Sequence, residues 1–252
     1  SARLTARPRE PSNRPHMKVS VVVPVYNEEG NVEPLVREFA PVAVQLPGLE
    51  VVLVDDGSSD ATWARITEAA ARHPYVRGIR GERNRGQTAA MLLGLRESRG
   101  DVLVTMDGDL QNNPADIPRL VERMDAVDVV CGYRAKRRDS WSRRAASRIG
   151  NTIRNWVTHD GLRDTGCSLK AFRRDCLADL PYLNGAHRFM GAYFRLHGRS
   201  LEQLPVDHRA RTHGVSKYTN LKRLPRTTFD LIGFLWYRQR LLRDVKAGAA
   251  TA

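Results

Sequence analysis

Cysteine is scarce in this chain, and its scarcity excludes two common stabilising devices. The 252 residues include three cysteines, Cys131, Cys167 and Cys176. Their number is odd and they form no Cys-x-x-Cys pair, so the sequence predicts neither a disulfide framework nor a zinc site. Residues 1–16 are too polar to contain the apolar core of a secretory signal. We therefore expect the chain to work in a reducing cytoplasm.

Apolar runs long enough to cross a membrane are also missing. In the C-terminal region the apolar stretch Leu231–Tyr237 is far shorter than the about 20 residues that span a bilayer. Trp236 and Tyr237 stand among arginines, a composition that suits the lipid headgroup region. We expect residues 219–252 to form an amphipathic helical segment and tail, peripherally associated with the inner face of the cell membrane. A helix packed on the main domain, or docked to a membrane protein partner, is the alternative.

Acidic residues are too few to balance the basic ones. The chain has 41 Lys and Arg against 28 Asp and Glu, a formal net charge of +13. Much of the excess lies in one segment, at Arg134, Lys136, Arg137, Arg138, Arg143, Arg144 and Arg148. A solvated basic helix is the plainest interpretation, and nucleic acid is a second. We expect no nucleic-acid partner, because aromatic residues make up only 7% of the chain and no aromatic-rich binding module accompanies the charge. A phosphorylated lipid at an anionic membrane surface accounts for the charge better.

The order of patterns along the chain predicts one large α/β domain. A chain of this length can bury about three quarters of its unfolded surface. Strand and helix patterns alternate, which is typical of a mostly parallel sheet covered on both faces. The helix candidates are Glu29–Leu46, Asp60–Arg72, Gly86–Ser98 and Pro114–Asp125, and later strand candidates lie near Val127–Gly132 and Leu201–Val206. Residues 1–16 are rich in Pro and Arg with no apolar period, and we interpret them as a disordered basic leader before a domain over residues 17–218.

Two aspartates end the apolar run Val102–Met106 and indicate a metal site. Asp107 and Asp109 are separated by one glycine, Gly108. Carboxylates this close repel each other, and each resists ionisation unless a cation neutralises both. Mg²⁺ or Mn²⁺ fits, because hard divalent ions take oxygen ligands and often share them with the phosphates of a substrate. The alternative is a strand-end turn with solvated acids.

Other strands bring polar groups to the same expected edge. The β-branched run before Pro24 is followed by Tyr26 and Glu28, and a second run ends in Asp55 and Asp56. Between the second and third runs lies Asn84–Ala90, where a glycine and small residues mark the start of a helix whose free N–H groups would face anions. The convergence of these features favours a ligand site at the carboxyl edge of the sheet.

The motifs together resemble family 2 glycosyltransferases of the GT-A fold. The resemblance rests on PVYNEEGN, VDDGSSDAT, NRGQTAAMLLGL, GDVLVTMDGDLQNNPADIP, GYRAKRRDSW, DTGCSLKAFRRD, GAHRFMGA and HRARTHGVSKY, and covers roughly residues 18–218. More narrowly, these blocks resemble the branch of dolichol-phosphate mannose synthases and bacterial polyprenyl-phosphate glycosyltransferases. The resemblance implies the GT-A (nucleotide-diphospho-sugar transferase) fold, a mostly parallel mixed sheet with helices on both faces.

The resemblance also implies roles for individual residues. Asp109 and Gln111 would hold the divalent metal, and Asp107 would lie near the metal or the transferred sugar. A nucleotide-sugar donor, with a UDP-sugar slightly favoured over GDP-mannose, would contact Pro24, Tyr26, Glu28, Asp55, Asp56, Asp107, Gly108, Arg211, Ser216 and Lys217. The last three would form a phosphate clamp in a loop that Gly214 keeps pliable. His187 is a further site candidate on the resemblance alone.

The expected acceptor is a polyprenyl phosphate. A phosphate monoester is already mostly ionised at neutral pH, so it needs positive charge to hold it rather than a base to activate it. Arg134 with one of Arg143, Arg144 and Arg148 would supply that charge. Family members that act on hydroxyls often carry a Glu-Asp pair, and here Asp164-Thr165-Gly166-Cys167 stands in the expected stretch. Asp164 is therefore either a base for a hydroxyl acceptor or, as we favour, a carboxylate that orients an arginine. A non-catalytic basic binding protein is the alternative from another class.

Overall fold

The structure is a computed structural model that describes residues 17–135, 154–209 and 220–241, with only the backbone described for 220–227. The strands are β1 (Val19–Val25), β2 (Glu50–Asp55), β3 (Val76–Arg80), β4 (Val102–Thr105), β5 (Val129–Arg134), β6 (Lys170–Arg173) and β7 (Leu201–Val206). The α-helices are α1 (Glu29–Gln45), α2 (Thr62–Arg72), α3 (Gln87–Glu97), α4 (Ile117–Glu122), α6 (Met190–Leu196) and α7 (Asn220–Arg240). Short 3₁₀ segments are η1 (Pro114–Asp116), η2 (Arg123–Asp125), η3 (Arg174–Asp179) and η4 (Ala186–Phe189). Residues 1–16, expected as a leader, lie outside the described part.

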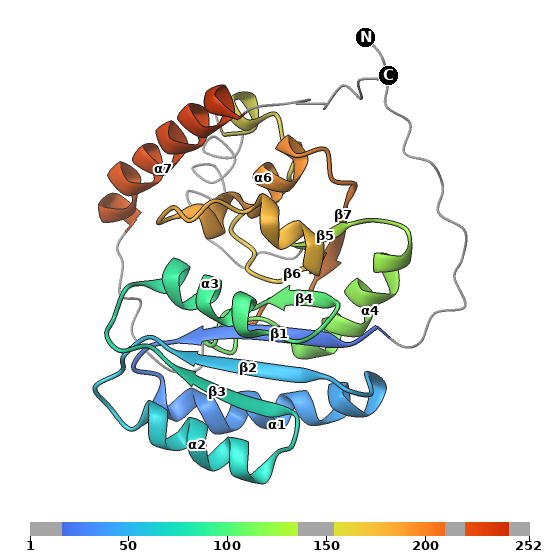
Figure 1. Cartoon of the computed structure of the whole chain (residues 1–252), viewed down its shortest axis with the longest axis vertical. Coiled ribbons are helices and arrows are strands. Elements are labelled where there is room, and N and C mark those ends of the chain that lie inside the picture. The colour runs from blue at the N-terminus through green and yellow to red at the C-terminus, as the bar shows by residue number, and fades with distance from the viewer. Residues whose placement is uncertain (1–16, 136–153, 210–219, 242–252) are drawn as a thin grey trace, which may run out of the picture.

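The seven strands form one mixed sheet in the order β3-β2-β1-β4-β6-β5-β7. Every neighbouring pair is parallel except those of β6, which runs antiparallel to both β4 and β5. β-Branched residues dominate β1 and β2, as expected for strands buried on both faces. The predicted fold class is confirmed, and Figure 1 shows the sheet crossing the molecule with helices on either side.

Alternate residues of the strands belong to two apolar clusters, one on each face of the sheet. One cluster includes Val21 and Val23 with apolar residues of α1, α2 and α4. The other includes Val22 and Val54 with apolar residues of α3, α6 and α7. This alternation follows from the two-residue side-chain period of a strand. The first three predicted helices agree with α1, α2 and α3 to within about two residues at each end, the normal uncertainty of helix boundaries. The fourth, Pro114–Asp125, is α-helical only over α4, and its first and last three residues form the 3₁₀ segments η1 and η2.

Two strands were missed by the sequence patterns, and each has a physical reason. β3 is an edge strand with an arginine on each face, Arg77 and Arg80, so its apolar signal is weak. β6 has four residues and begins with the buried Lys170, which interrupts the apolar run that marks a central strand.

The three cysteines are free, in agreement with the absence of a predicted disulfide framework, and all three are buried. Burial raises the pKa of the Cys131 thiol to about 11, which keeps it protonated and unreactive near neutral pH. No helix in the described ranges combines the length and the apolar character that crossing a membrane requires.

The contact between α3 and the sheet gives a stability prediction with its own control. A β-carbon at Gly94 would lie 2.5 Å from Val22 Cγ1 and 2.7 Å from Val54 Cγ2, two stiff side chains. Overpacking costs about 1–3 kcal/mol, whereas alanine is favoured over glycine in helices by about 1 kcal/mol. We expect Gly94→Ala to lower the free energy of unfolding by about 1–2 kcal/mol, measured as a lower midpoint in urea at unchanged slope.

Gly30 in α1 is the matched control, because nothing lies within 4 Å of a β-carbon placed there. Gly30→Ala should leave the midpoint unchanged or raise it slightly. An unchanged midpoint for Gly94→Ala would contradict the close packing of α3 on β1 and β2.

Candidate active site

Three adjacent parallel strands end at one edge of the sheet and bring much of the predicted site together. β1 lies between β2 and β4, and in the register Val25 pairs with Asp55 and Val22 with Thr105. The strand ends and the loops after them carry Pro24, Tyr26, Glu28, Asp55, Asp56, Asp107, Gly108, Asp109 and Gln111. A β-carbon at Gly108 would lie 2.6 Å from Val25 Cγ1, so only glycine lets the Asp-Gly-Asp loop approach the end of β1 so closely.

Asp107 is held by side chains from two other segments. Gln87, the first residue of α3, donates from Nε2 to Asp107 Oδ1 at 2.7 Å. The Asp107 N–H donates to Ser168 Oγ at 3.2 Å, and Asn112 Nδ2 donates to the same hydroxyl oxygen at 2.7 Å. Ser168 thus fixes both ends of the turn that carries the two aspartates.

The charge balance at Asp107 makes a cation favourable there. Burial raises the pKa of the Asp107 carboxyl, and the neighbouring Asp109 raises it further. Lys170, buried on β6, and Arg134 act in the opposite direction without overcoming these effects. The Lys170 ammonium donates to the carbonyl oxygen of Cys167, a neutral partner. A further positive charge between Asp107 and Asp109 would therefore relieve an electrostatic cost that the described residues leave in place.

Gln111 presents a hard oxygen beside Asp109. The Gln111 N–H donates to Asp109 Oδ1 at 3.2 Å, and its side-chain Nε2 donates to the carbonyl oxygen of Arg209 at 3.3 Å. Because the amide nitrogen donates to the Arg209 carbonyl oxygen, the amide oxygen of Gln111 points the other way and could coordinate a cation. Asp, Glu, His and Cys do not gather in threes as metal ligands within the described ranges. The predicted ligands Asp109 and Gln111, with Asp107 adjacent, could offer carboxylate and amide oxygens, a chemistry that suits Mg²⁺ or Mn²⁺.

The same turn holds Arg209, the last described residue before the predicted phosphate clamp. The Arg209 N–H donates to the Gln111 carbonyl oxygen at 2.8 Å, and Arg209 Nη1 lies 2.6 Å from Glu38 Oε1. The chain therefore enters residues 210–219 directly beside the Asp-Gly-Asp turn. The clamp residues themselves, Arg211, Gly214, Ser216 and Lys217, lie outside the described residues, so their role stays a prediction.

The two carboxylates at the end of β2 accept hydrogen bonds from backbone N–H groups and so position the loops around them. Asp55 is fully buried and its Oδ1 accepts the Ser58 N–H at 2.9 Å. Asp56 accepts the N–H groups of Arg85 at 3.0 Å and Gly86 at 2.8 Å. Asp56 thus brings the N-terminus of α3 to the edge of the sheet, where Gln87 reaches Asp107. Contact of either aspartate with a nucleoside remains a prediction.

Glu28 has a comparable local role after β1. Its Oε2 accepts a hydrogen bond from Asn31 Nδ2 at 2.5 Å, and its N–H donates to Thr62 Oγ1 at 2.8 Å. These bonds join the loop after β1 to the beginning of α2. They fix the loop that carries Tyr26 and Glu28 without deciding whether either residue touches a donor.

Arg134 and Asp164 form the best-defined ion pair of the site. Arg134 Nε lies 2.6 Å from Asp164 Oδ2 and Nη2 lies 2.8 Å from Oδ1, a bidentate arrangement. The two side chains are 17% and 9% exposed. A β-carbon at Gly166 would lie 2.8 Å from Arg134 Nη2, so the glycine leaves room for the guanidinium. The geometry is that of a carboxylate orienting an arginine, the role that the sequence favoured for Asp164.

Arg154 stabilises the loop that carries Asp164, a role that sequence analysis did not predict. Its guanidinium is buried, donates to Thr165 Oγ1 and to the Leu162 carbonyl oxygen, and lies 3.7 Å from Asp160. Burial lowers the pKa of Arg154, and Asp160 partly opposes that effect. The other basic residues predicted for the acceptor, Arg143, Arg144 and Arg148, lie outside the described residues.

His187 is a neutral member of the polar cluster at the start of α3. Its Nδ1 lies 2.7 Å from Thr88 Oγ1, which also accepts the Gly185 N–H at 2.9 Å. Burial lowers the pKa of His187 to about 3, and the nearby Arg188 adds to the effect. The imidazole is therefore uncharged near neutral pH and can neither bind a phosphate as a cation nor donate a proton as an imidazolium.

Three residues that contact or face Asp107 were missed as individuals by sequence reasoning: Gln87, Ser168 and Lys170. All three lie within the motif blocks NRGQTAAMLLGL and DTGCSLKAFRRD. Their position within these motif blocks was the one feature of the sequence that could have marked them as site residues. Which member of each block reaches the Asp-Gly-Asp turn depends on how β6 and α3 pack against β4.

Comparison with known proteins agrees with the geometry. Residues 20–180 match the model of the family described as Glycosyl transferase family 2. The chain is 37% identical over 242 residues to the dodecaprenyl-phosphate galacturonate synthase of Rhizobium johnstonii, covering 92% of this chain and 71% of that protein. It is 39% identical over 218 residues to the undecaprenyl-phosphate 4-deoxy-4-formamido-L-arabinose transferase of Edwardsiella ictaluri, covering 85% of this chain and 66% of that protein.

Solved structures support the fold. The glucosyl-3-phosphoglycerate synthase of Mycobacterium tuberculosis, crystallised with Mn²⁺, uridine diphosphate and glucosyl-3-phosphoglycerate, superposes with a TM-score of 0.69. The superposition covers 90% of this chain and 82% of that protein at 20% identity. A second structure of the same enzyme holds Mg²⁺ and uridine diphosphate, with the same TM-score.

The family match covers most of the described domain and includes the Asp-Gly-Asp turn, and two relatives exceed 30% identity over most of the chain. The sequence-based resemblance is thereby confirmed: the chain belongs to glycosyl transferase family 2 and is a glycosyltransferase of the GT-A fold.

Proposed function

We propose that this enzyme transfers one sugar from a nucleotide-sugar donor to a polyprenyl phosphate, with inversion at the anomeric carbon and with a divalent metal. The two relatives named above support the acceptor class, since their names specify a dodecaprenyl and an undecaprenyl phosphate. The chain spans 71% and 66% of their lengths. The proposal therefore concerns the transfer chemistry of the domain in hand.

The Arg134–Asp164 pair is the observation on which the acceptor assignment rests. The positive charge of Arg134 acts to lower the pKa of the Asp107 carboxyl, which supports a position for the guanidinium near the proposed sugar site. Both oxygens of Asp164 accept hydrogen bonds from that guanidinium. A carboxylate engaged in this way orients a cation and is a poor base. The pair supports a role for Arg134 as an oriented guanidinium that would meet a phosphate acceptor, with Asp164 offsetting part of its charge.

The chemistry proposed is a direct displacement. An ionised oxygen of the lipid phosphate forms a bond to the anomeric carbon while the bond from that carbon to the diphosphate oxygen breaks. The electron pair leaves with the nucleoside diphosphate, and no proton has to be removed from the acceptor. Attack opposite the leaving group inverts the anomeric configuration.

Asp109 and the amide oxygen of Gln111, with Asp107 adjacent, would hold the metal. Bound there, a divalent cation would act as a Lewis acid for the charge that develops on the leaving diphosphate. The chain's own residues fix this set: Ser168 and Gln87 hold Asp107, and Arg209 orients the Gln111 amide.

We place this reaction at the cytoplasmic face of the cell membrane, with the enzyme peripherally associated and a membrane protein partner as an option. The lipid acceptor and the net charge of +13 support that placement. A UDP-sugar is our first choice of donor, ahead of GDP-mannose, on the resemblance to the bacterial polyprenyl-phosphate members.

Removing the proposed metal ligand should abolish turnover. We expect Asp109→Asn to lower kcat by about 100-fold or more, the scale of losing one strong electrostatic stabiliser of a developing charge. The measurement is release of nucleoside diphosphate from a small panel of donors, with Mn²⁺ or Mg²⁺ and a short-chain polyprenyl phosphate.

Asp101→Asn is the matched control, because Asp101 is an exposed aspartate just before the other end of β4 and its carboxylate accepts a hydrogen bond from the Lys18 N–H. It should retain turnover within about twofold. Full activity of Asp109→Asn, or donor turnover that never depends on the lipid phosphate, would contradict the proposal.

Changes at the ion pair should affect the acceptor. Hydrogen bonds to charged groups contribute about 1.5–3 kcal/mol, or about 10- to 150-fold in affinity. We expect Arg134→Gln to raise the KM for polyprenyl phosphate by about 10-fold or more and to leave the donor KM within about threefold. Asp164→Asn should shift the acceptor KM in the same direction by a smaller factor.

Arg163→Gln serves as the control, since Arg163 is an exposed neighbour whose guanidinium lies over the Tyr133 ring. If Asp164 is instead a base for a hydroxyl acceptor, Asp164→Asn will lower kcat by about 10²- to 10⁴-fold with little change in either KM. That result would move the assignment to a hydroxyl acceptor.

A further inference from the structure

One side of α7 is already packed on the domain. Phe234 is fully buried, and its ring lies 5.8 Å from that of Phe189 and 5.1 Å from that of Tyr193. Tyr237, one turn further on, meets Tyr193 edge to face at 5.2 Å. These contacts make α7 part of the apolar cluster on the α3 and α6 side of the sheet. The alternative of a helix packed on the domain therefore holds for this side.

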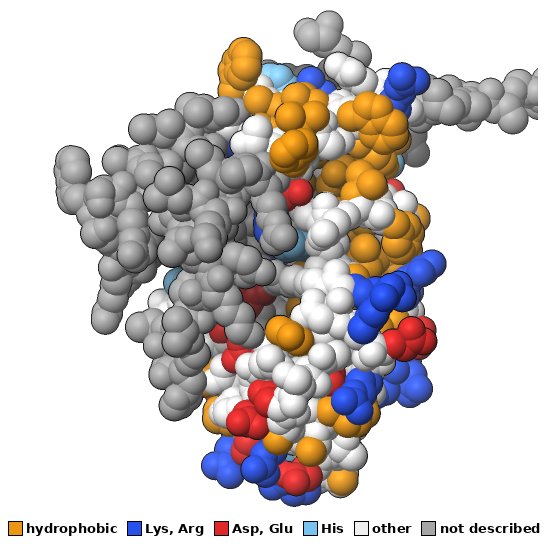
Figure 2. Space-filling model, turned by 90° about the vertical axis from the view of Figure 1, so that its left-hand side faces the viewer, with side chains coloured by type: hydrophobic (Ala, Val, Ile, Leu, Met, Phe, Trp, Pro, Cys, Tyr) orange, Lys and Arg blue, Asp and Glu red, His pale blue; other side chains and the backbone are white. Residues whose placement is uncertain are grey.

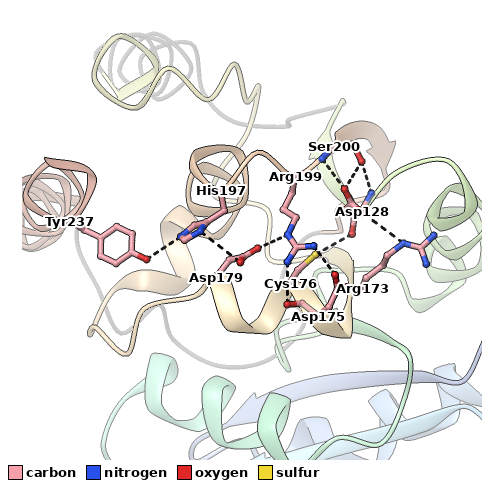
Figure 3. A network of polar contacts seen from close by, with 9 residues as sticks. All are labelled: Asp128, Arg173, Asp175, Cys176, Asp179, His197, Arg199, Ser200 and Tyr237. Carbon is pink, nitrogen blue, oxygen red and sulfur yellow. Dashed lines mark hydrogen bonds and ion pairs between the residues drawn. The ribbon is translucent and has the colours of Figure 1, made fainter. Parts of the chain in front are cut away.

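Polar contacts fix α7 at two further points. At its middle, Asp230 pairs with Arg188 of η4. Near its end, Tyr237 Oη lies 3.0 Å from Nε2 of His197, which follows α6. His197 in turn faces Asp179, and Asp179 accepts a 2.6 Å hydrogen bond from Arg199 (Figure 3). The helix is thereby joined to the part of the sheet formed by β5, β6 and β7.

The opposite side of α7 is apolar and exposed. Phe229, Ile232 and Trp236 are 74%, 56% and 58% exposed, and their spacing of three and four residues places them on one face of the helix. We call these three residues the outer face of α7. Trp156, 77% exposed, lies on the neighbouring helical turn 154–158, whose Val157 carbonyl accepts a 2.8 Å bond from Arg238. Apolar side chains gather on this part of the molecule in Figure 2.

The chemistry of this face fits a lipid surface. Two of its side chains and the adjacent Trp156 are aromatic, and exposed Arg240 follows at the end of the helix, the combination found where helices lie in lipid headgroups. The net charge of +13 favours an anionic surface over a neutral one. Because the domain already covers the inner side of α7, the outer face has no partner left within the described fold.

A short segment connects this helix to the active site. Residues 184–189 lie between α3 and α7: Gly185 and His187 contact Thr88 at the start of α3, while Arg188 and Phe189 contact α7. A β-carbon at Gly185 would lie 2.4 Å from Asp230 Oδ1, so the segment also touches α7 through its backbone. Gln87, next to Thr88, donates to Asp107. A surface bound to α7 is therefore held at a fixed position relative to Asp107 and the Asp-Gly-Asp turn.

We propose that the outer face of α7, together with Trp156, docks on an anionic lipid bilayer and sets the orientation of the active site above it. The orienting role rests on the proposed function, because that function requires a lipid acceptor held in the bilayer. The docking itself does not require any transfer activity, so the two can fail separately.

The experiment measures binding of the full chain to vesicles by sedimentation. The probes are vesicles of phosphatidylglycerol with phosphatidylethanolamine, and vesicles of phosphatidylcholine alone. We expect the wild type to bind the anionic vesicles at least tenfold more tightly, and the triple variant Phe229→Ser, Ile232→Ser, Trp236→Ser to lose at least tenfold of that binding. Val44→Ser is the matched control, because Val44 is 82% exposed on α1, which packs on the other face of the sheet. It should bind as the wild type does.

Turnover of a short-chain, water-soluble polyprenyl phosphate separates docking from chemistry. The triple variant should keep this turnover within about threefold and its thermal midpoint near that of the wild type, and the single variant Trp236→Gln should show a smaller loss of binding. Equal vesicle binding by wild type and triple variant would overturn the proposal. So would a wild type that ignores vesicles and forms dimers that the triple variant does not form. Vesicle binding that depends on α7 without any lipid-dependent turnover would leave the docking in place and remove the proposed function.

Discussion

The repulsion between Asp107 and Asp109 is the constraint on which the arrangement of the site depends. Two carboxylates on one short turn at a half-buried sheet edge are unfavourable unless the surroundings hold them. The pKa of Asp107 is raised by burial and by Asp109 even though two cations oppose the shift. Hydrogen bonds from Gln87 and to Ser168 keep Asp107 in place against this repulsion. The fold thus keeps two carboxylates close together in a position that would suit the proposed divalent cation.

The reversal of β6 is what assembles the rest of the site around that turn. β6 runs antiparallel between β4 and β5, pairing Lys170 with Thr105 on one side and with Cys131 on the other. Because β6 begins at the carboxyl edge of the sheet, the chain before it lies at that edge and brings Ser168 to the Asp-Gly-Asp turn. The same segment places Asp164 beside Arg134 at the end of β5. In a purely parallel sheet these residues would lie at the opposite edge.

α3 and the segment that contains η4 connect the strand-end carboxylates to α7. Asp56 holds the N-terminus of α3 by two backbone N–H groups, and Thr88 of α3 binds the segment that contains His187. That segment also contacts α7 through Arg188 and Phe189. A continuous set of hydrogen bonds and ring contacts therefore runs from Asp107 through the start of α3 and residues 184–189 to the helix whose outer face is apolar. Its inner face has become part of the core, which gives the helix a fixed position on the domain.

The sequence by itself determined the features that depend on local chemistry. β-Branched runs predicted β1, β2 and β4, the spacing of Asp107 and Asp109 predicted an oxygen site for a cation, and the separated motifs predicted the family. Each of these signals lies within about ten neighbouring residues, where propensity and charge act directly. The tertiary structure alone decided which distant residues meet. It identified Ser168, Gln87 and Lys170 as the neighbours of Asp107. It also paired Asp164 with Arg134 and packed one face of α7 into the apolar core. Those outcomes follow from the direction of β6 and the packing of α3 and α7, which are set by contacts among residues far apart in the chain.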